Sequence, residues 1–258
     1  ETGEASEHPW TGWWWPMLDT TNPNLYDSNG PLEKYDKYYK LIDANSSKEW
    51  EKHFLYTDGP RGHQSLNDWA GHCHAWAAAS YLFPEAKNPI LLNNILFHIG
   101  DLKGLVDECY YDGANYNVIT GGGHPTPEKF WTLIRTWIKG KNKVLIMDLK
   151  PEEAIYNYPV YKYIVTYNVI NEDNYNCNFT IYYASDFATE DKPFFDYNYI
   201  GTFEKSKTYT FTIKLDSIGN ILNQGVWTSA EEGPDVIWRA EMEEPITGGN
   251  PHVKLSDV

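Results

Sequence analysis

Apolar residues recur along the chain with two different periods, and the period changes near residue 140. Before that point the spacing fits helices, as at Phe130, Leu133 and Trp137, which share one helical face. Thr126 and Pro127 precede this face and are suited to the N-cap and the first turn. The predicted helices span residues 32–42, 46–55, 71–82, 89–109 and 126–139.

After residue 140, apolar and polar residues alternate with a period of two, which predicts strands. The predicted strands span residues 143–149, 160–170, 177–184, 198–203, 209–214, 221–228 and 236–240. A helical N-terminal half followed by an antiparallel β C-terminal half indicates the α+β class. We therefore expect a single α+β domain over residues 4–258, with a helical lobe at about 31–140 and a β lobe at about 141–240.

Composition narrows the class of protein. The chain has 258 residues, of which 41% are hydrophobic and 16% aromatic, as expected for a globular protein. The net charge of −15 disfavours binding to nucleic acid, because phosphates would be repelled. No stretch of the sequence is long and apolar enough for a transmembrane helix, so we expect no transmembrane segment.

Two features of the sequence favour a secreted glycoprotein. Glu1-Thr2-Gly3 resembles an expression scar left after a secretion signal is cleaved, and we exclude residues 1–3 from the fold. Asn45 and Asn178 each begin an N-glycosylation sequon.

The chain has three cysteines, and an odd count in a secreted protein suggests one disulfide and one free thiol. Cys73 lies in the segment with the strongest chemical signal, so we expect Cys109 and Cys177 to form the disulfide. The alternative is that all three thiols are unpaired and buried.

The segment Gly71-His72-Cys73-His74-Ala75-Trp76 carries that signal. A cysteine in the first turn of a buried helix has its thiolate stabilised by the positive end of the helix. The preceding glycine is expected to give a substrate room to approach. Gly-x-Cys followed by Trp and Ala is the arrangement of papain-like and transglutaminase-like nucleophiles. Cys73 is therefore the candidate nucleophile; an inert buried thiol and a metal site are the alternatives.

A thiol nucleophile needs a base, an orienting group and an oxyanion donor. His124 follows three glycines, and Asp148 ends an apolar strand, so we predict them as base and orienter. The order Cys, His, Asp at these intervals is similar to that of animal transglutaminases. Asn67 is the candidate oxyanion donor, and Asn157 is a second candidate orienter. Three other histidines are weaker candidates: His252 as the base, and His72 and His74 as residues that shape the site.

Three blocks of the sequence resemble the transglutaminase elicitors of oomycetes and their bacterial relatives. The first is the nucleophile segment at residues 71–80, and the second is Tyr156-Asn157-Tyr158-Pro159-Val160, similar to a Trp-Asn-Gln-Pro-Val elicitor peptide. The third combines residues 13–16, 234–238 and 250–253. Tyr156 stands where that elicitor peptide has Trp, and Tyr158 stands where it has Gln.

The resemblance implies a secreted protein-glutamine γ-glutamyltransferase that acts through a cysteine thioester on proteins carrying glutamine and lysine. It also implies a papain/transglutaminase-like core and stimulation by calcium, although the chemistry itself requires no cofactor. The sequence assigns no metal ligands. Two other functions stay open: a papain-like cysteine protease, and an inactive secreted recognition or adhesion module on the same scaffold.

Overall fold

The computed structural model describes residues 1–17, 22–52, 69–111, 115–120, 124–186, 196–229, 232–241 and 249–258. The chain divides into two units by its internal contacts. We call one the sheet unit, which comprises Glu1–Pro9, Tyr116–Ser185 and Glu204–Ala240. The other is the helical unit, which comprises Trp10–Asn115, Asp186–Phe203 and Glu241–Val258. Helices and antiparallel strands both occur, as the α+β prediction requires.

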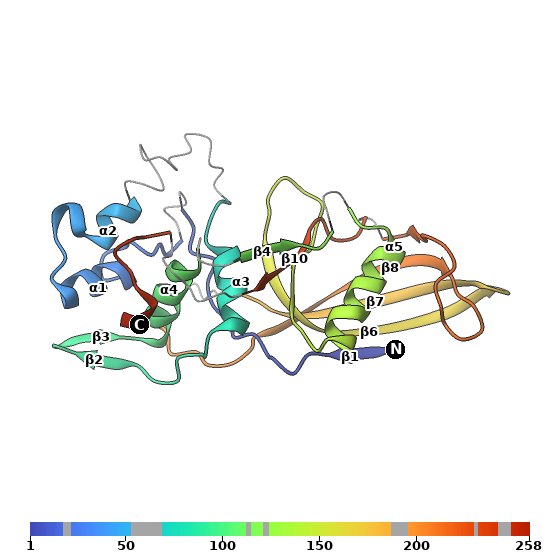
Figure 1. The fold of residues 1–258 in the computed structure, drawn as a ribbon, viewed down its shortest axis with the longest axis horizontal. Helices are drawn as coiled ribbons and strands as arrows, with labels where there is room; N and C mark the ends of the chain where they lie inside the picture. Colours follow the sequence, from blue (N-terminus) through green and yellow to red (C-terminus); the bar gives the residue numbers. More distant parts are fainter. Residues whose placement is uncertain are drawn as a thin grey trace. The chain divides into compact units, whose positions relative to one another are not determined.

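Within the described residues, the sheet unit is built around one eight-stranded sheet (Figure 1). Its strand order is β4-β10-β5-β6-β7-β8-β9, and β1 pairs with β6 outside this order. Strands β10, β5, β6, β7, β8 and β9 pair antiparallel with their neighbours along this order. Their bounds are β1 Thr2–Glu4, β4 Asn115–Val118, β5 Leu145–Asp148, β6 Asn157–Asn171, β7 Asn174–Ala184, β8 Glu204–Lys214, β9 Val226–Trp227 and β10 Ile237–Glu241.

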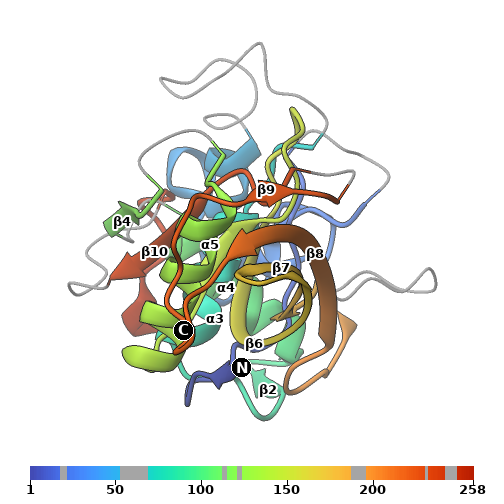
Figure 2. The same ribbon diagram turned by 90° about the vertical axis from the view of Figure 1, so that its right-hand side faces the viewer.

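The core of the sheet unit lies between the long strands and helix α5 (Pro127–Ile134), which a π-helical segment, η3 (Arg135–Gly140), extends. Figure 2 shows α5 beside the curled strands β7 and β8. Thr126 caps α5 by accepting a hydrogen bond from the Lys129 backbone N–H, as the sequence predicted. Alternate strand residues face the core, so Phe179 and Phe211 are fully buried and their rings lie 6.3 Å apart.

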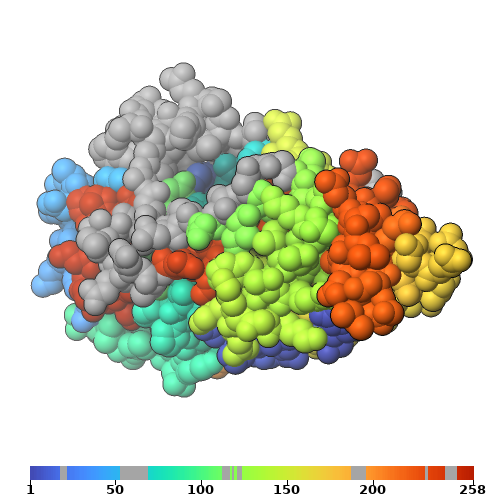
Figure 3. All heavy atoms as spheres, turned by 45° about the vertical axis from the view of Figure 1, so that its right-hand side comes forward, coloured from blue at the N-terminus to red at the C-terminus, as the bar shows by residue number. Residues whose placement is uncertain are grey.

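The far end of the β6–β7 hairpin is solvent exposed and is visible as the yellow atoms at the right of Figure 3. Val169 is 66% and Ile170 is 52% exposed there. The buried alternation of β6 therefore ends before its tip, which limits the core to the first two thirds of the strand.

The helical unit is built from short helices and one small hairpin. Ser46 caps α2 by accepting a hydrogen bond from the Glu49 backbone N–H. The bounds are α1 Pro31–Tyr39, η1 Asp43–Asn45, α2 Ser47–Trp50, α3 Cys73–Leu82, β2 Ile90–Leu92, β3 Ile95–Phe97, α4 Ile99–Tyr110 and η5 Leu255–Asp257.

The predicted helix over residues 89–109 is wrong in its first half. Residues 90–97 form the β2–β3 hairpin, and only α4 is helical. Asn93 and Asn94 connect the strands with φ values of 49° and 63°. Asparagine tolerates this left-handed conformation, and two such residues in succession make the turn of a tight hairpin.

Two further expectations need correction. Residues 198–203 do not form a strand, and β8 instead begins at Glu204, five residues before the predicted start. Residues 1–3 are part of the fold, because β1 pairs with β6 and the Glu1 carboxylate binds Arg135, with Nη2 and Oε2 2.6 Å apart.

Candidate functional site

The candidate nucleophile is the first residue of a buried helix in the helical unit. α3 begins at Cys73, whose side chain is 5% exposed, and His72 is its N-cap residue. Ala75 and Trp76 are buried behind it. The free N–H groups of a helix N-terminus favour negative charge close to them. The structure thus gives Cys73 the local setting that the sequence predicted.

Gly71 packs closely against the backbone of Trp14 and Trp15. A Cβ at this position would lie 2.6 Å from the carbonyl oxygen of Trp14 and 3.0 Å from that of Trp15. The His72 backbone N–H donates to the same Trp14 oxygen over 2.6 Å. The absence of a side chain at Gly71 therefore lets the backbone of Trp14 and Trp15 pack closely against it. The expected role of Gly71 in giving a substrate room to approach stays a prediction.

His72 lies in a fully buried cluster with two glutamates. Its Nε2 is 3.0 Å from Oε1 of Glu51, and its Nδ1 is 3.7 Å from Oε2 of Glu108. Burial lowers the pKa of His72 to about 4, against the opposing effect of Glu108. Burial, and then the Glu51 charge, raises the pKa of Glu108 well above its usual range. His72 is therefore neutral near pH 7.

His74 is also held by its surroundings. Its Nε2 donates to the Tyr111 carbonyl oxygen at 3.1 Å, and its ring lies 4.8 Å from the Tyr111 ring. Burial, with a smaller contribution from the neighbouring His72, lowers the pKa of His74 to about 4. Both histidines next to Cys73 are therefore engaged in packing and hydrogen bonds, in keeping with a shaping role.

His124 lies in the sheet unit, where its carboxylate partner is Asp235. The His124 Nδ1 atom is 3.2 Å from Oδ1 of Asp235, and the two side chains are 47% and 24% exposed. The sequence did not identify Asp235, which is distant from His124 along the chain. Its position one residue before the predicted strand at 236–240 was the only available signal.

Asp148 ends β5 beside Asp235. The Asp148 N–H donates to the Val236 oxygen, and the Asp235 N–H donates to the Asp148 oxygen at 3.1 Å. Burial, with a smaller contribution from the charge of Asp235, raises the pKa of Asp148 to about 7. The residue that pairs directly with His124 is thus Asp235, and Asp148 is its close neighbour.

Asn157 stands opposite Asp148 in the antiparallel pairing of β5 with β6. Its Oδ1 accepts a hydrogen bond of 2.7 Å from the Trp238 indole N–H. The sheet unit therefore brings together His124, Asp235, Asp148 and Asn157 around the start of β10, whereas Cys73 belongs to the helical unit.

The expected Cys109–Cys177 disulfide is absent, and among the described residues no cysteine is in a disulfide. Cys109 is buried in α4 of the helical unit, and Cys177 is buried in β7 of the sheet unit. Each thiol fills an apolar position in the core of its own unit. Burial raises the pKa of Cys177 to about 11 and also raises that of Cys109.

The other predicted residues are the candidate oxyanion donor and the two asparagines of the glycosylation sequons. Asn67, the candidate oxyanion donor, lies outside the described residues. Asn45 is exposed in η1, which suits a glycosylation site. Asn178 is half-buried in the middle of β7, paired on both sides with β6 and β8.

The predicted stimulation by calcium stays a prediction. Calcium takes six to eight oxygen ligands. Within the described ranges, the cluster of three or more metal-binding side chains is Glu51, His72 and Glu108, which includes an imidazole nitrogen. This donor set does not fit calcium.

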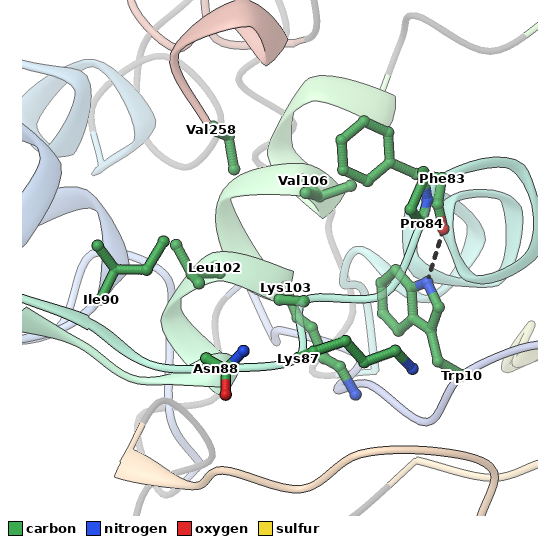
Figure 4. Close-up of a pocket in the computed structure, with 11 residues that line it drawn as sticks. Trp10, Phe83, Pro84, Lys87, Asn88, Ile90, Leu102, Lys103, Val106 and Val258 are labelled. Carbon is green, nitrogen blue, oxygen red and sulfur yellow. Dashed lines mark hydrogen bonds between the residues drawn. The ribbon is translucent and has the colours of Figure 1, made fainter.

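A cavity of about 350 Å³ opens elsewhere in the helical unit (Figure 4). Trp10, Phe83 and Val106 form apolar walls, and the Trp10 indole N–H donates to the Phe83 carbonyl oxygen at 3.1 Å. None of the predicted site residues lines this cavity.

In the described part of the chain, no helix is long and apolar enough to cross a membrane. No curated protein sequence matches the chain. The family model described as "Transglutaminase elicitor" matches residues 57–130, a range that contains Cys73 and His124.

The fold is similar to that of the GP42 transglutaminase from Phytophthora sojae, with a TM-score of 0.74 and 18% sequence identity. The match covers 99% of this chain and 88% of that one. At this identity the likeness concerns the fold. The resemblance to transglutaminase elicitors is thereby confirmed: residues 57–130 match that family, and the whole chain shares the fold of a Phytophthora transglutaminase.

Proposed function

We propose that this protein is a transglutaminase-type acyltransferase that uses Cys73 as its nucleophile. The observation that carries the proposal is the position of Cys73 as the first residue of buried α3, inside the region that matches the elicitor family. The fold shared with GP42, a transglutaminase, supports the same reaction class. The papain/transglutaminase-like core belongs to this proposal as well.

In the proposed reaction, the Cys73 thiolate attacks the carboxamide carbon of a glutamine side chain. The backbone N–H of Cys73 and the Asn67 amide hold the oxyanion. Protonated His124 gives its proton to the departing ammonia, and a thioester remains. A lysine amine then displaces the thiolate to form an isopeptide bond and loses a proton, whereas water gives glutamate.

The roles of His124 and its carboxylate neighbours rest on chain order and on the His124–Asp235 pair. Asp148 is proposed as the orienting residue and Asn157 as its alternative, since both lie at the same end of β5 and β6. The substrates are proteins that carry glutamine and lysine. Secretion is part of the proposal and is consistent with the exposed sequon at Asn45.

Incorporation of a fluorescent amine, dansylcadaverine, into a glutamine-bearing protein tests the proposal. Cys73→Ala should lower the rate by about 10³-fold or more, because the bond-forming atom is lost. Cys109→Ala is the matched control: it removes a thiol that is 2% exposed in the same unit and should keep the rate. Equal rates in the wild type and the Cys73 variant would rule out Cys73 as nucleophile.

The same samples separate the alternative functions. Peptide-bond hydrolysis that depends on Cys73, without amine incorporation, would identify a cysteine protease. Absence of both reactions, together with a thiol at position 73 that iodoacetamide does not alkylate, would identify a recognition module. Calcium stimulation is tested by comparing rates in calcium chloride and in EDTA; equal rates would reject it.

A further inference from the structure

The cluster around His72 has a feature that hydrogen bonding does not account for. A carboxylate oxygen only accepts hydrogen bonds, so the His72 Nε2–H donates to Glu51 over 3.0 Å. The neutral ring then carries its lone pair on Nδ1. This atom is buried, and among the described residues it has no hydrogen-bond partner.

The lone pair of His72 faces the carboxyl group of Glu108. Oε2 of Glu108 is 3.7 Å away, which is too long for a hydrogen bond. Both carboxyl oxygens of Glu108 are buried, and neither has a hydrogen-bond partner of good geometry among the described residues, although Glu51 and Asn250 lie close enough to affect the pKa of Glu108. Buried acceptors that face each other are unfavourable unless a proton or a cation lies between them.

The spacing suits a metal ion better than a proton. Two ligands bound at about 2.1 Å to a tetrahedral zinc ion are about 3.4 Å apart, close to the observed separation of Nδ1 and Oε2. Ligand atoms of Glu51, His72 and Glu108 all lie within 4.8 Å of one another. All three side chains are fully buried, so bulk water cannot satisfy them.

The donor types point to a class of ion. One imidazole nitrogen with two carboxylates suits zinc and its first-row neighbours, whereas calcium and magnesium prefer oxygen alone. Glu51 Oε1 accepts the Nε2–H of His72, an arrangement that orients histidine ligands in metal sites, and the Glu51 carboxylate counts as a possible ligand because its ligand atom lies within 4.8 Å of those of His72 and Glu108.

We propose that Glu51, His72 and Glu108 form a binding site for one divalent transition-metal ion, with zinc as the representative. The ligands come from the end of α2, the N-cap of α3 and α4. The ion would therefore tie these three helices together directly before Cys73. This role is structural, and it is independent of the proposed acyl transfer.

Metal content of the full chain tests the site directly. The protein is stripped with EDTA, dialysed against Zn²⁺ and then against metal-free buffer, and its zinc is measured by plasma mass spectrometry. We expect about one zinc ion per chain. Loading with Co²⁺ gives an independent signal, because coordination by nitrogen and oxygen at an asymmetric site produces visible absorption bands. Wild-type protein that retains no zinc would overturn the proposal.

Two isosteric variants of adjacent buried residues provide a matched comparison. Glu108→Gln removes a ligand carboxylate and should weaken zinc binding about tenfold or more. Asp107→Asn changes the preceding residue, equally buried, whose Oδ2 accepts the Trp15 indole N–H at 3.0 Å, and it should leave zinc binding unchanged. Equal zinc loss in both variants would contradict the assignment.

Thermal unfolding keeps the test informative if a variant folds poorly. Zn²⁺ should raise the Tm of the wild type and of Asp107→Asn, and it should not raise the Tm of Glu108→Gln. If the two glutamates only share a proton, the Tm of all three proteins will be indifferent to zinc, and the metal site is then rejected.

Discussion

The sheet unit and the helical unit fill their interiors with different chemistry. Between β6–β8 and α5, the sheet unit packs aromatic rings such as Phe130, Phe179 and Phe211. In the helical unit every residue of α4 is buried, and that helix includes four charged residues, namely Asp101, Lys103, Asp107 and Glu108. Buried rings need only good packing, whereas buried charges need partners. The stability of the helical unit therefore depends on ion pairing and pH to a greater extent.

The largest effect is expected in the ring core of the sheet unit. Phe179 lies 4.7 Å from the Phe130 ring and 5.2 Å from the Tyr163 ring. Phe179→Ala should lower the free energy of unfolding by about 5 kcal/mol, because it leaves a cavity among rings that cannot close around it. Urea denaturation measures the loss. The control Tyr167→Ala removes a ring that is 47% exposed and should stay within about 0.5 kcal/mol of the wild type.

The counterpart in the helical unit is a buried lysine. Lys103 Nζ bonds to Oε1 of Glu85 at 2.8 Å and to the Thr11 oxygen at 2.6 Å. Lys103→Met should lower the free energy of unfolding by about 3–4 kcal/mol, because the buried partners lose their donor.

Lys87 provides the control for this substitution, because it binds the same Glu85 carboxylate but is 62% exposed. Lys87→Met should cost no more than about 1 kcal/mol in urea denaturation. Equal losses in the two lysine variants would show that burial is not what makes the Lys103 pair important, and the contrast between the units would fail.

A smaller effect depends on pH and involves Asp148 of the sheet unit. Its pKa rises from 3.8 to about 7 on folding. A raised acid pKa means that the folded state holds the proton more tightly, so this contribution to stability is present below about pH 4 and is lost as the pH rises through 7.

Asp148→Asn removes that dependence. The decline in the free energy of unfolding between pH 4 and pH 8 should be smaller by about 1–2 kcal/mol in the variant than in the wild type, after allowance for solvent screening. Urea denaturation across this range measures it. Asp216→Asn is the control of opposite sign, because backbone hydrogen bonds lower the pKa of Asp216. A variant that declines as steeply as the wild type would show that Asp148 is ionised throughout.

The smallest effect concerns the partly exposed pair of His124 and Asp235. Asp235→Asn should cost about 0.2–1 kcal/mol of stability, since solvent screens the interaction over its 3.2 Å separation. A double-mutant cycle with His124→Gln measures the coupling. Coupling above about 2 kcal/mol would mean that this pair is desolvated in solution, and the distinction between exposed and buried pairs would need revision.

Local signals in the sequence predicted the structure correctly where the structure depends only on residues within one helical turn. Thr126 caps its helix as predicted, because capping involves only residues three positions apart. Apolar spacing failed at residues 90–97, where the same residues fit one face of a helix and also a hairpin. Asn93-Asn94 settled that choice, because its left-handed backbone is incompatible with continuing a helix.

The sequence alone determined the α+β class, a helix over about residues 71–82 that contains Cys73, and the resemblance to transglutaminase elicitors. Each of these depends on patterns among residues that are close together along the chain. Tertiary structure alone decided that His72 meets Glu51 and Glu108, that Asp235 pairs with His124, and that Cys109 and Cys177 form no disulfide. These contacts join residues far apart along the chain. Their free energies depend on burial and distance, which spacing in the sequence does not contain.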